Sequence, residues 1–515
     1  MSRHARGSSS GISRRGFIDG LGGSAALGSV ALQAVSAAPV SGLPPGAALR
    51  VRPVLTWQLQ QRKERTSWRA YGGIVTREQV DREAARIVEE LKVFAAKATF
   101  PIEIQPTLLV NSPAEAAAAR DSDTDVHLIY ASGGPVEWLE TIVNSQKPAV
   151  MFLRHNSGPM YFYYETAHFR FLRRSEDDFR QQFMDVDDVV VDDYGDVLWR
   201  LRALYGLKNA KGTKSLAIGG LRSYSTQGQR FGPPHVRGVW NYELIPVADQ
   251  EVERRVAKAR ADQDVMREVI RQTEDYLAQP NLTLATEKKF VVNSFLALRV
   301  FKELMRETGS TNVGVANCMG SLIRSLDTPP CLVLSLLNDE GYTAFCHTDY
   351  THTPPGVLLR WISGKPSFVC NSHYPHHGLV TLAHCSTPRR MNGVDFEPTK
   401  IVTHFESDYG AATRVEFRRG QVVTAILPNF TCTKWMGLRG SIAAVPDFPA
   451  CRSQMEVRID GDWRRFLSDM QGFHTVVSYG DHLREVGYAL KKVGVAWENV
   501  SPPPETRPAT PALSG

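Results

Sequence analysis

Several features that would assign this 515-residue chain to a familiar class are missing from it. Beyond its first 40 residues, no window reaches the ~18 uninterrupted apolar residues of a membrane-spanning helix, so we expect no stable membrane span. No block or stripe of basic residues stands out, which argues against nucleic-acid binding. The chain lacks the His-Glu-x-x-His motif of zinc hydrolases, and no Gly-x-Gly-x-x-Gly fingerprint of a dinucleotide site follows its predicted strands.

Cysteine is absent from the first 317 residues, and seven cysteines follow. The odd count excludes complete internal pairing, and the spacing contains no Cys-x-x-Cys pair that would indicate a zinc knuckle. Several of these cysteines lie in apolar segments, where a free thiol behaves as a small hydrophobic side chain. We therefore expect mostly buried free thiols at Cys318, Cys331, Cys346, Cys370, Cys385, Cys432 and Cys451.

Residues 1–38 have the pattern of a bacterial twin-arginine export signal. The pair Arg14-Arg15 precedes Phe17, a weakly apolar Gly/Ala-rich stretch follows, and small residues at 36–38 suit a cleavage site. A disordered basic tail is the alternative, which the apolar residues directly after the arginine pair disfavour. We expect the twin-arginine translocase to export the protein to the periplasm or the extracellular space. Without this segment, which holds four Arg and one Asp, the net charge falls from +6 to +3.

Segments 39–210 and 211–365 alternate predicted strands and helices. This rhythm predicts two Rossmann-like α/β domains with parallel sheets covered on both faces. The first should contain strands at 51–57, 102–110, 126–130 and 149–153 and helices at 76–96, 113–119 and 135–144. The second should contain strands at 214–220, 313–318 and 331–337 and helices at 249–278 and 286–308. Loops 131–134, 155–158 and 219–223 follow strands, where open α/β sheets place ligands.

Residues 366–500 have a different texture, with short β segments separated by turn residues. The pattern predicts a β-rich third domain, sandwich-like or barrel-like. Strands are expected at 400–405, 414–417, 421–427, 440–444 and 455–459, with a closing helix at 481–493. The Pro-rich tail 501–515 is expected to be disordered.

Nine of the 14 histidines lie between His347 and His482. Histidine is the commonest metal ligand and titrates near neutral pH, so this clustering predicts a polar functional site. Eight metal-capable side chains fall within 38 positions: His347, Asp349, His352, Asn371, His373, His376, His377 and His384. Three of them, His352, His376 and His377, are expected to decorate loops outside the site.

The order of motifs in this region resembles the L-fucose isomerase / L-arabinose isomerase superfamily. That family has a Cys-Glu-x-Asp segment, a Gly-x-Pro step, a strand ending in Asp, and a His-Cys pair. The matching positions here are 346–349, 364–366, Asn371 and 384–385, and segment 472–476 is similar to the one that supplies the family's last metal ligand. The resemblance covers most of the chain after residue 38 and is strongest over 313–497. It implies aldose–ketose isomerisation of a monosaccharide through a metal-assisted enediol, with Mn²⁺.

The resemblance also implies site residues, and this sequence departs from the family at two of them. His347 stands where the family has a glutamate that is both metal ligand and catalytic carboxylate, and Asn371 replaces an aspartate ligand. By the resemblance, the metal ligands are His347, Asn371 and His474, and the catalytic residues are His347 and Asp349. Losing two carboxylates favours a softer ion such as Zn²⁺ or Ni²⁺, or no metal, over Mn²⁺. A second register puts Glu340 in the catalytic position, but its spacing to Asn371 fits less well.

The sugar-binding residues are expected to be Glu406, Asp408 and His384, with a solvated turn as the alternative for the acidic loop 406–410. Two classes of function stay open. One is a sugar isomerase-like enzyme whose altered ligands weaken or abolish activity. The other is an exported, non-catalytic carbohydrate-binding protein on the same fold. The partner in both is a small sugar, no nucleic acid is expected, and a homo-oligomer is left open.

Overall fold

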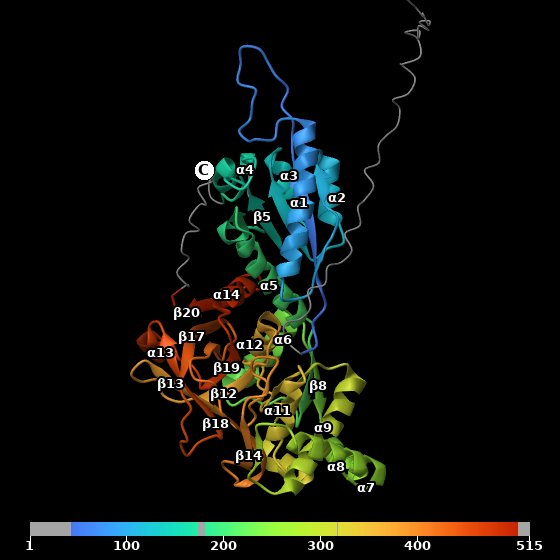
Figure 1. Ribbon diagram of the computed structural model, residues 1–515, viewed down its shortest axis with the longest axis vertical. Helices are drawn as coiled ribbons and strands as arrows, with labels where there is room; N and C mark the ends of the chain where they lie inside the picture. Colours follow the sequence, from blue (N-terminus) through green and yellow to red (C-terminus); the bar gives the residue numbers. More distant parts are fainter. Residues whose placement is uncertain (1–42, 174–180, 317, 503–515) are drawn as a thin grey trace, which may run out of the picture.

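The computed structural model describes residues 43–173, 181–316 and 318–502. The predicted export signal and all but the first two residues of the predicted tail lie outside these ranges. Figure 1 shows an elongated molecule with one α/β unit at the top and the β-barrel and second α/β unit at the bottom. Within the described ranges, none of the helices combines the length and the apolar character needed to cross a bilayer.

The N-terminal unit is built on a six-stranded parallel sheet of order β2-β1-β4-β5-β6, with β3 also paired to β1. Its strands are β1 (Leu49–Thr56), β2 (Ile102–Ile104), β3 (Leu108–Val110), β4 (Val126–Ala131), β5 (Ala149–Leu153) and β6 (Val189–Val191). Every residue of β4 and β5 is buried, as expected for strands covered on both faces. The single strand predicted at 102–110 is instead two short strands, because Pro106 has no N–H to donate to a ladder.

The first three helices of this unit confirm the predicted ones, and two further helices were not predicted. They are α1 (Arg77–Lys97), α2 (Pro113–Asp121), α3 (Val136–Val143), α4 (Phe162–Thr166) and α5 (Tyr194–Ala210). The start of α1 shows the predicted capping box, in which Thr76 and Gln79 each accept a backbone N–H of the other.

The second α/β unit has a four-stranded parallel sheet of order β11-β10-β7-β8. Its strands are β7 (Lys214–Ile218), β8 (Glu243–Val247), β10 (Asn312–Val315) and β11 (Thr343–Phe345). Its helices are α6 (Thr226–Trp240), α7 (Asp249–Ala261), α8 (Gln263–Leu277), α9 (Lys288–Thr308), α10 (Ile323–Leu326), α11 (Cys331–Asp339) and α12 (Thr353–Ser363).

Two predictions in this unit are wrong. The segment 331–337 is not a strand but most of α11, and all nine residues of that helix are buried. A helix buried on every side has no polar face, so its sequence shows no helical period and reads as an apolar strand. The helix predicted at 249–278 is two helices, because Asp262 ends α7 and its carboxylate accepts the N–H groups of Asp264 and Val265 at the start of α8.

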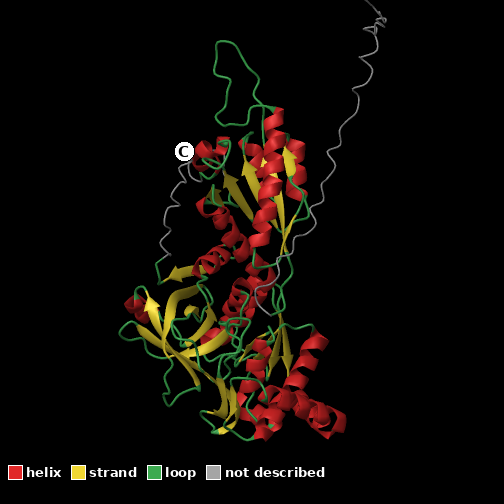
Figure 2. Cartoon of the chain, viewed as in Figure 1, coloured by secondary structure: helices red, strands yellow, loops and turns green. Residues whose placement is uncertain are grey.

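The C-terminal region forms a closed antiparallel barrel of six strands (Figure 2). They are β12 (Phe368–Ser372), β13 (Leu379–His384), β16 (Val422–Pro428), β17 (Lys434–Ala444), β18 (Ser453–Asp460) and β19 (His474–Tyr479). The pairing of β16 with β17 closes the ring, and β20 (Ala496–Asn499) adds in parallel to β17. The β-rich region therefore begins close to residue 366, and α13 (Trp463–Asp469) and α14 (Leu483–Lys491) accompany it.

Two strands of the β-rich region leave the barrel. The hairpin β14 (Thr399–His404) and β15 (Tyr409–Val415) pairs with β9 (Leu282–Leu284) of the second α/β unit. A further link is the stacking of Trp240, at the end of α6, on Trp435 of β17, with ring centroids 5.5 Å apart. Both indoles are buried, so the barrel is held against the second sheet from two sides.

Candidate functional site

The site lies where the carboxyl edge of the second sheet meets one end of the barrel. Segment 346–352 follows β11 directly and leads into α12, and loop 219–225 follows β7. Thr348 ties the two loops together, because its hydroxyl donates to Gly220 O at 2.8 Å and accepts the N–H of Arg222 at 2.9 Å. The crevice outside the carboxyl ends of parallel strands is the usual ligand position in open α/β sheets.

A glycine in the central strand lets segment 346–352 lie across the sheet edge. A Cβ on Gly314 of β10 would come within 2.7 Å of the carbonyl oxygen of His347. Any side chain at this position would therefore push the His347–Thr348 backbone away from the sheet.

Asp349 is fully buried and held by two hydrogen bonds. Ser223 Oγ donates to Oδ2 at 2.5 Å, and the N–H of Thr351 donates to Oδ1 at 2.9 Å. Each carboxylate oxygen keeps further lone-pair capacity for another partner. The sequence therefore places a fixed, acceptor-rich carboxyl group at the sheet edge.

Three imidazoles and one phenol ring gather beside it. The ring centroid of His474, the first residue of β19, lies 4.9 Å from that of His347 and 5.1 Å from that of His352. The ring of Tyr224 packs edge-on against His347 and His474, with ring centroids 4.5 Å and 4.8 Å away. The barrel and the second sheet thus contribute to one group of side chains.

His352 is the least satisfied member of this group. Its side chain is 1% exposed, yet neither ring nitrogen has a hydrogen-bond partner among the described residues. Ligand atoms of Asp349, His352 and His474 all lie within 4.8 Å of one another. A separation of this size can be bridged by one ion after small side-chain rotations, and an ion would satisfy the buried nitrogens.

Burial sets the protonation of these rings. Burial lowers the pKa of His352, and the charge of Asp349 opposes this shift. Burial also lowers the pKa of His347 and of His474 well below the ordinary value. The neighbouring imidazoles lower the pKa of His347 and His474 further. The rings are therefore neutral at physiological pH, the form in which imidazole binds a metal.

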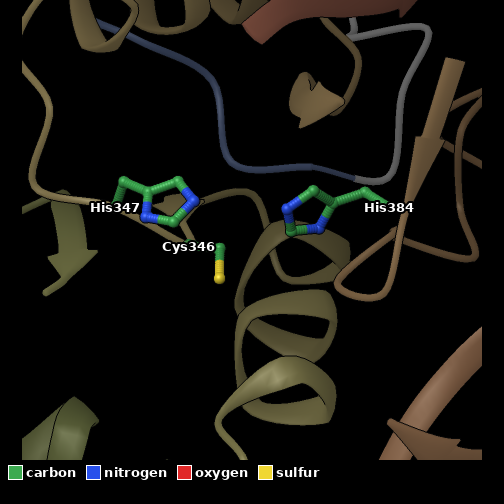
Figure 3. A group of neighbouring side chains, drawn as sticks. All are labelled: Cys346, His347 and His384. Atoms are coloured by element: carbon green, nitrogen blue, oxygen red, sulfur yellow. The ribbon is translucent and has the colours of Figure 1, made fainter. Parts of the chain in front are cut away.

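A second group of donors lies beside the first (Figure 3). Ligand atoms of Cys346, His347 and His384 are also within 4.8 Å of one another. In Figure 3 the two imidazoles face each other, with the Cys346 sulfur below the line between them. However, Nδ1 of His384 accepts the N–H of Ser386 at 3.1 Å, which places the ring proton of neutral His384 on Nε2. Nε2 then lacks the lone pair that a metal ligand needs.

The thiol in this second group is also engaged. Cys346 Sγ lies 3.6 Å from Cys318 Sγ, and this contact together with burial raises the pKa of Cys346 well above that of a free thiol. All seven cysteines are free, and five of them are buried. Of the two groups, the one containing Asp349, His352 and His474 is therefore the better prepared metal site.

The remaining predicted residues are placed as follows. Asn371 of β12 is directly opposite His474 in the β12–β19 register, and its amide lies 3.8 Å from Cys451 Sγ. Burial and two nearby cysteines are the main causes that raise the pKa of Tyr224. The exposed Glu406 is close enough to raise it further. Asp408 lies in the β14–β15 turn, where its carboxylate accepts the Thr403 hydroxyl at 2.7 Å.

One prediction about the histidines is corrected. His376 and His377 are exposed loop residues as predicted, but His352 lies buried within the site. Ser223 belongs to the loop 219–223 that the sequence predicts as a ligand position, and the structure adds Tyr224, the residue that follows this loop. A scan against models of known protein families finds none that matches this chain, and no curated protein matches it either.

Proposed function

We propose that this is a sugar isomerase-like enzyme that interconverts an aldose and a ketose beside Asp349, His347, His352 and His474. The observation that carries the proposal is an aromatic rim over buried, neutral bases. Tyr224 is 60% exposed and Phe473 is 41% exposed, and both rings contact His474. Exposed aromatic rings offer an apolar platform for a sugar face, while the polar groups beneath fix its orientation. The resemblance in motif order and a Rossmann-like reading of both parallel sheets support the same proposal.

The residues fit a divalent ion, but not the Mn²⁺ of the resembled family. We assign Asp349, His352 and His474 as the ligands, because His352 is buried with both nitrogens unpartnered. A ligand set of one carboxylate and two imidazoles suits Zn²⁺, Ni²⁺ or Fe²⁺. Mn²⁺ prefers a site with more carboxylate ligands. An ion there would polarise the oxygens on the first two carbons of the sugar.

His347 is the candidate base. Its imidazole is neutral and half-buried, and Tyr224 of the aromatic rim packs edge-on against it with ring centroids 4.5 Å apart. In the proposed reaction the imidazole takes the proton from C2 of the open-chain aldose. The electron pair of that C–H bond forms the C1–C2 double bond, and the π pair of the C1 carbonyl moves onto O1, which gives an enediolate. O1 then takes the hydroxyl proton of O2, the electron pair left on O2 forms the C2 carbonyl, and the imidazolium returns its proton to C1, which gives the ketose.

A second function is favoured by one specific observation. Burial lowers the pKa of His347 far below neutrality, and a weak base removes a carbon-bound proton slowly. The glutamate of the resembled family is absent from this position. The alternative is therefore a protein that binds a sugar at the same aromatic rim without turning it over.

Purified full-length protein, analysed for bound metal and supplied with a panel of aldoses, tests both functions. We expect one divalent ion per chain and ketose formation that falls at least tenfold in His352→Ala and in His474→Ala. The matched control is His376→Ala, an exposed histidine outside the site. Sugar binding without turnover selects the non-catalytic alternative. Absence of both sugar binding and turnover rejects the two functions together.

A further inference from the structure

A polar cavity lies away from the histidine site, between helices α8, α9 and α11 and the segment after β13. Its volume is about 540 Å³, within the range of small-molecule pockets. The residues that matter for its chemistry are Tyr276, Lys302, Arg306, Asp339, Glu340 and Arg390.

Three residues lining this cavity carry buried polar atoms that have no hydrogen-bond partner among the described residues. They are Tyr276 Oη, Asp339 Oδ2 and Arg390 Nε. Behind them, Arg389 is completely buried between the rings of Tyr276 and Phe396, and two of its guanidinium nitrogens are also unpartnered. Unsatisfied buried polar atoms are rare, so this many in one place indicates a missing partner.

The charges of the side chains that line the cavity indicate the charge of the missing partner. Four basic and four acidic side chains line the cavity, but three of the acids are already paired: Asp275 with Arg271, Glu303 with Arg299 and Glu340 with Lys302. Among the described residues neither Arg306 nor Arg390 forms an ion pair with a carboxylate, and two guanidinium nitrogens of Arg390 donate weakly to the carbonyl oxygens of Asp339 and Gly393, at 3.3 and 3.4 Å. The cavity therefore has guanidinium groups to offer and no free exposed carboxylate to balance them.

Asp339 cancels only part of this surplus at neutral pH. Its Oδ1 accepts the N–H of Arg390 at 2.7 Å, and its Oδ2 faces no partner. Burial raises the pKa of Asp339 to about 7, against the opposing effect of Arg389 and Arg390. A carboxyl group that is partly protonated near neutral pH can donate a hydrogen bond to an incoming oxygen.

We propose that this cavity is a binding site for a small hydroxylated organic anion. Its carboxylate or phosphate group is held by the guanidinium groups of Arg306 and Arg390, and its hydroxyl groups bond Asp339 and Tyr276. Guanidinium groups recognise both kinds of oxyanion through paired N–H donors. The site is independent of the proposed isomerase chemistry.

Calorimetric titration of the full chain with gluconate, glucose 6-phosphate and neutral glucose tests this site. We expect binding of at least one of the two anions and none of glucose at this cavity. Arg390→Ala should weaken the binding at least tenfold, and Tyr276→Phe, which removes only the hydroxyl, severalfold. The matched control Arg267→Ala changes an exposed arginine on α8 that pairs with Asp264 outside the cavity, and should leave binding unchanged.

The outcomes separate the alternatives. Binding of gluconate alone assigns a carboxylate ligand, and binding of glucose 6-phosphate alone assigns a phosphate ligand. His474→Ala, in the histidine site, should bind the anion as wild type does. Binding of neither anion, or unchanged affinity in both Arg390→Ala and Tyr276→Phe, would overturn the proposal. Loss of binding in His474→Ala would also overturn it, by placing the anion in the other site.

Discussion

Replacing Arg154 by methionine should destabilise the N-terminal α/β unit by about 3–5 kcal/mol, because it leaves a buried carboxylate without its counter-ion. Arg154 follows β5 and its side chain is 1% exposed. Its Nε lies 2.5 Å from Glu83 Oε1, and its Nη2 lies 2.6 Å from Glu90 Oε2. Glu83 is 3% exposed, and within the described part of the chain its one other donor is the hydroxyl of Tyr161.

Urea unfolding followed by circular dichroism measures this cost, with Arg77→Met as the control. Arg77 lies on α1, the helix that carries Glu83, and pairs with Asp81. Both side chains are about half exposed, so the loss of this pair should cost only about 0.3–0.5 kcal/mol. Adding Glu83→Gln to Arg154→Met removes the stranded charge and should recover part of the loss. Equal destabilisation by the two single variants, or no recovery in the double variant, would refute the reasoning.

Two further predictions concern pH and packing. Burial raises the folded-state pKa of Asp339 to about 7, above the ~3.9 of the unfolded chain, so stability should fall by up to ~4 kcal/mol as pH rises from about 4 to 7. Asp339→Asn should remove most of that slope in unfolding curves, and an unchanged slope contradicts the assignment. In Gly206→Ala the new Cβ would lie 2.3 Å from Ile362, where α5 packs on α12, and should cost about 1–3 kcal/mol. By contrast, Gly238→Ala, at an exposed position of α6, meets nothing within 4 Å and should gain about 0.5–1 kcal/mol. Thermal unfolding that ranks the two variants the other way contradicts the packing argument.

Local signals explain which parts of the fold the sequence predicts. The apolar runs of β4 and β5 are fully buried and bounded by turns, and the capping box at Thr76 marks the start of α1. The same logic fails for α11, because burial on all sides removes the polar face that identifies a helix. The pairing of β14 with β9 joins residues more than 100 positions apart, and no local pattern specifies it.

Some residues of the candidate site can likewise be predicted from the sequence, and others cannot. The clustering of metal-capable side chains in the sequence points to His347 and Asp349, whereas His474 is predicted only from the resemblance in motif order. The role of His352 depends on burial, which arises only when the end of the barrel covers the segment after β11. Tyr224 belongs to another loop, and only the folded sheet edge brings it to the histidines.

The central claim is that Asp349, His352 and His474 form a metal site at the junction of the barrel and the second sheet. X-ray absorption spectroscopy of the Zn²⁺-loaded protein tests it most directly. We predict nitrogen and oxygen neighbours at about 2.0–2.1 Å with no sulfur, and one ion per chain that is lost in His352→Ala but kept in Cys346→Ser. A sulfur neighbour at about 2.3 Å would place the ion on Cys346 instead, and full Zn²⁺ binding by His352→Ala would contradict the claim outright.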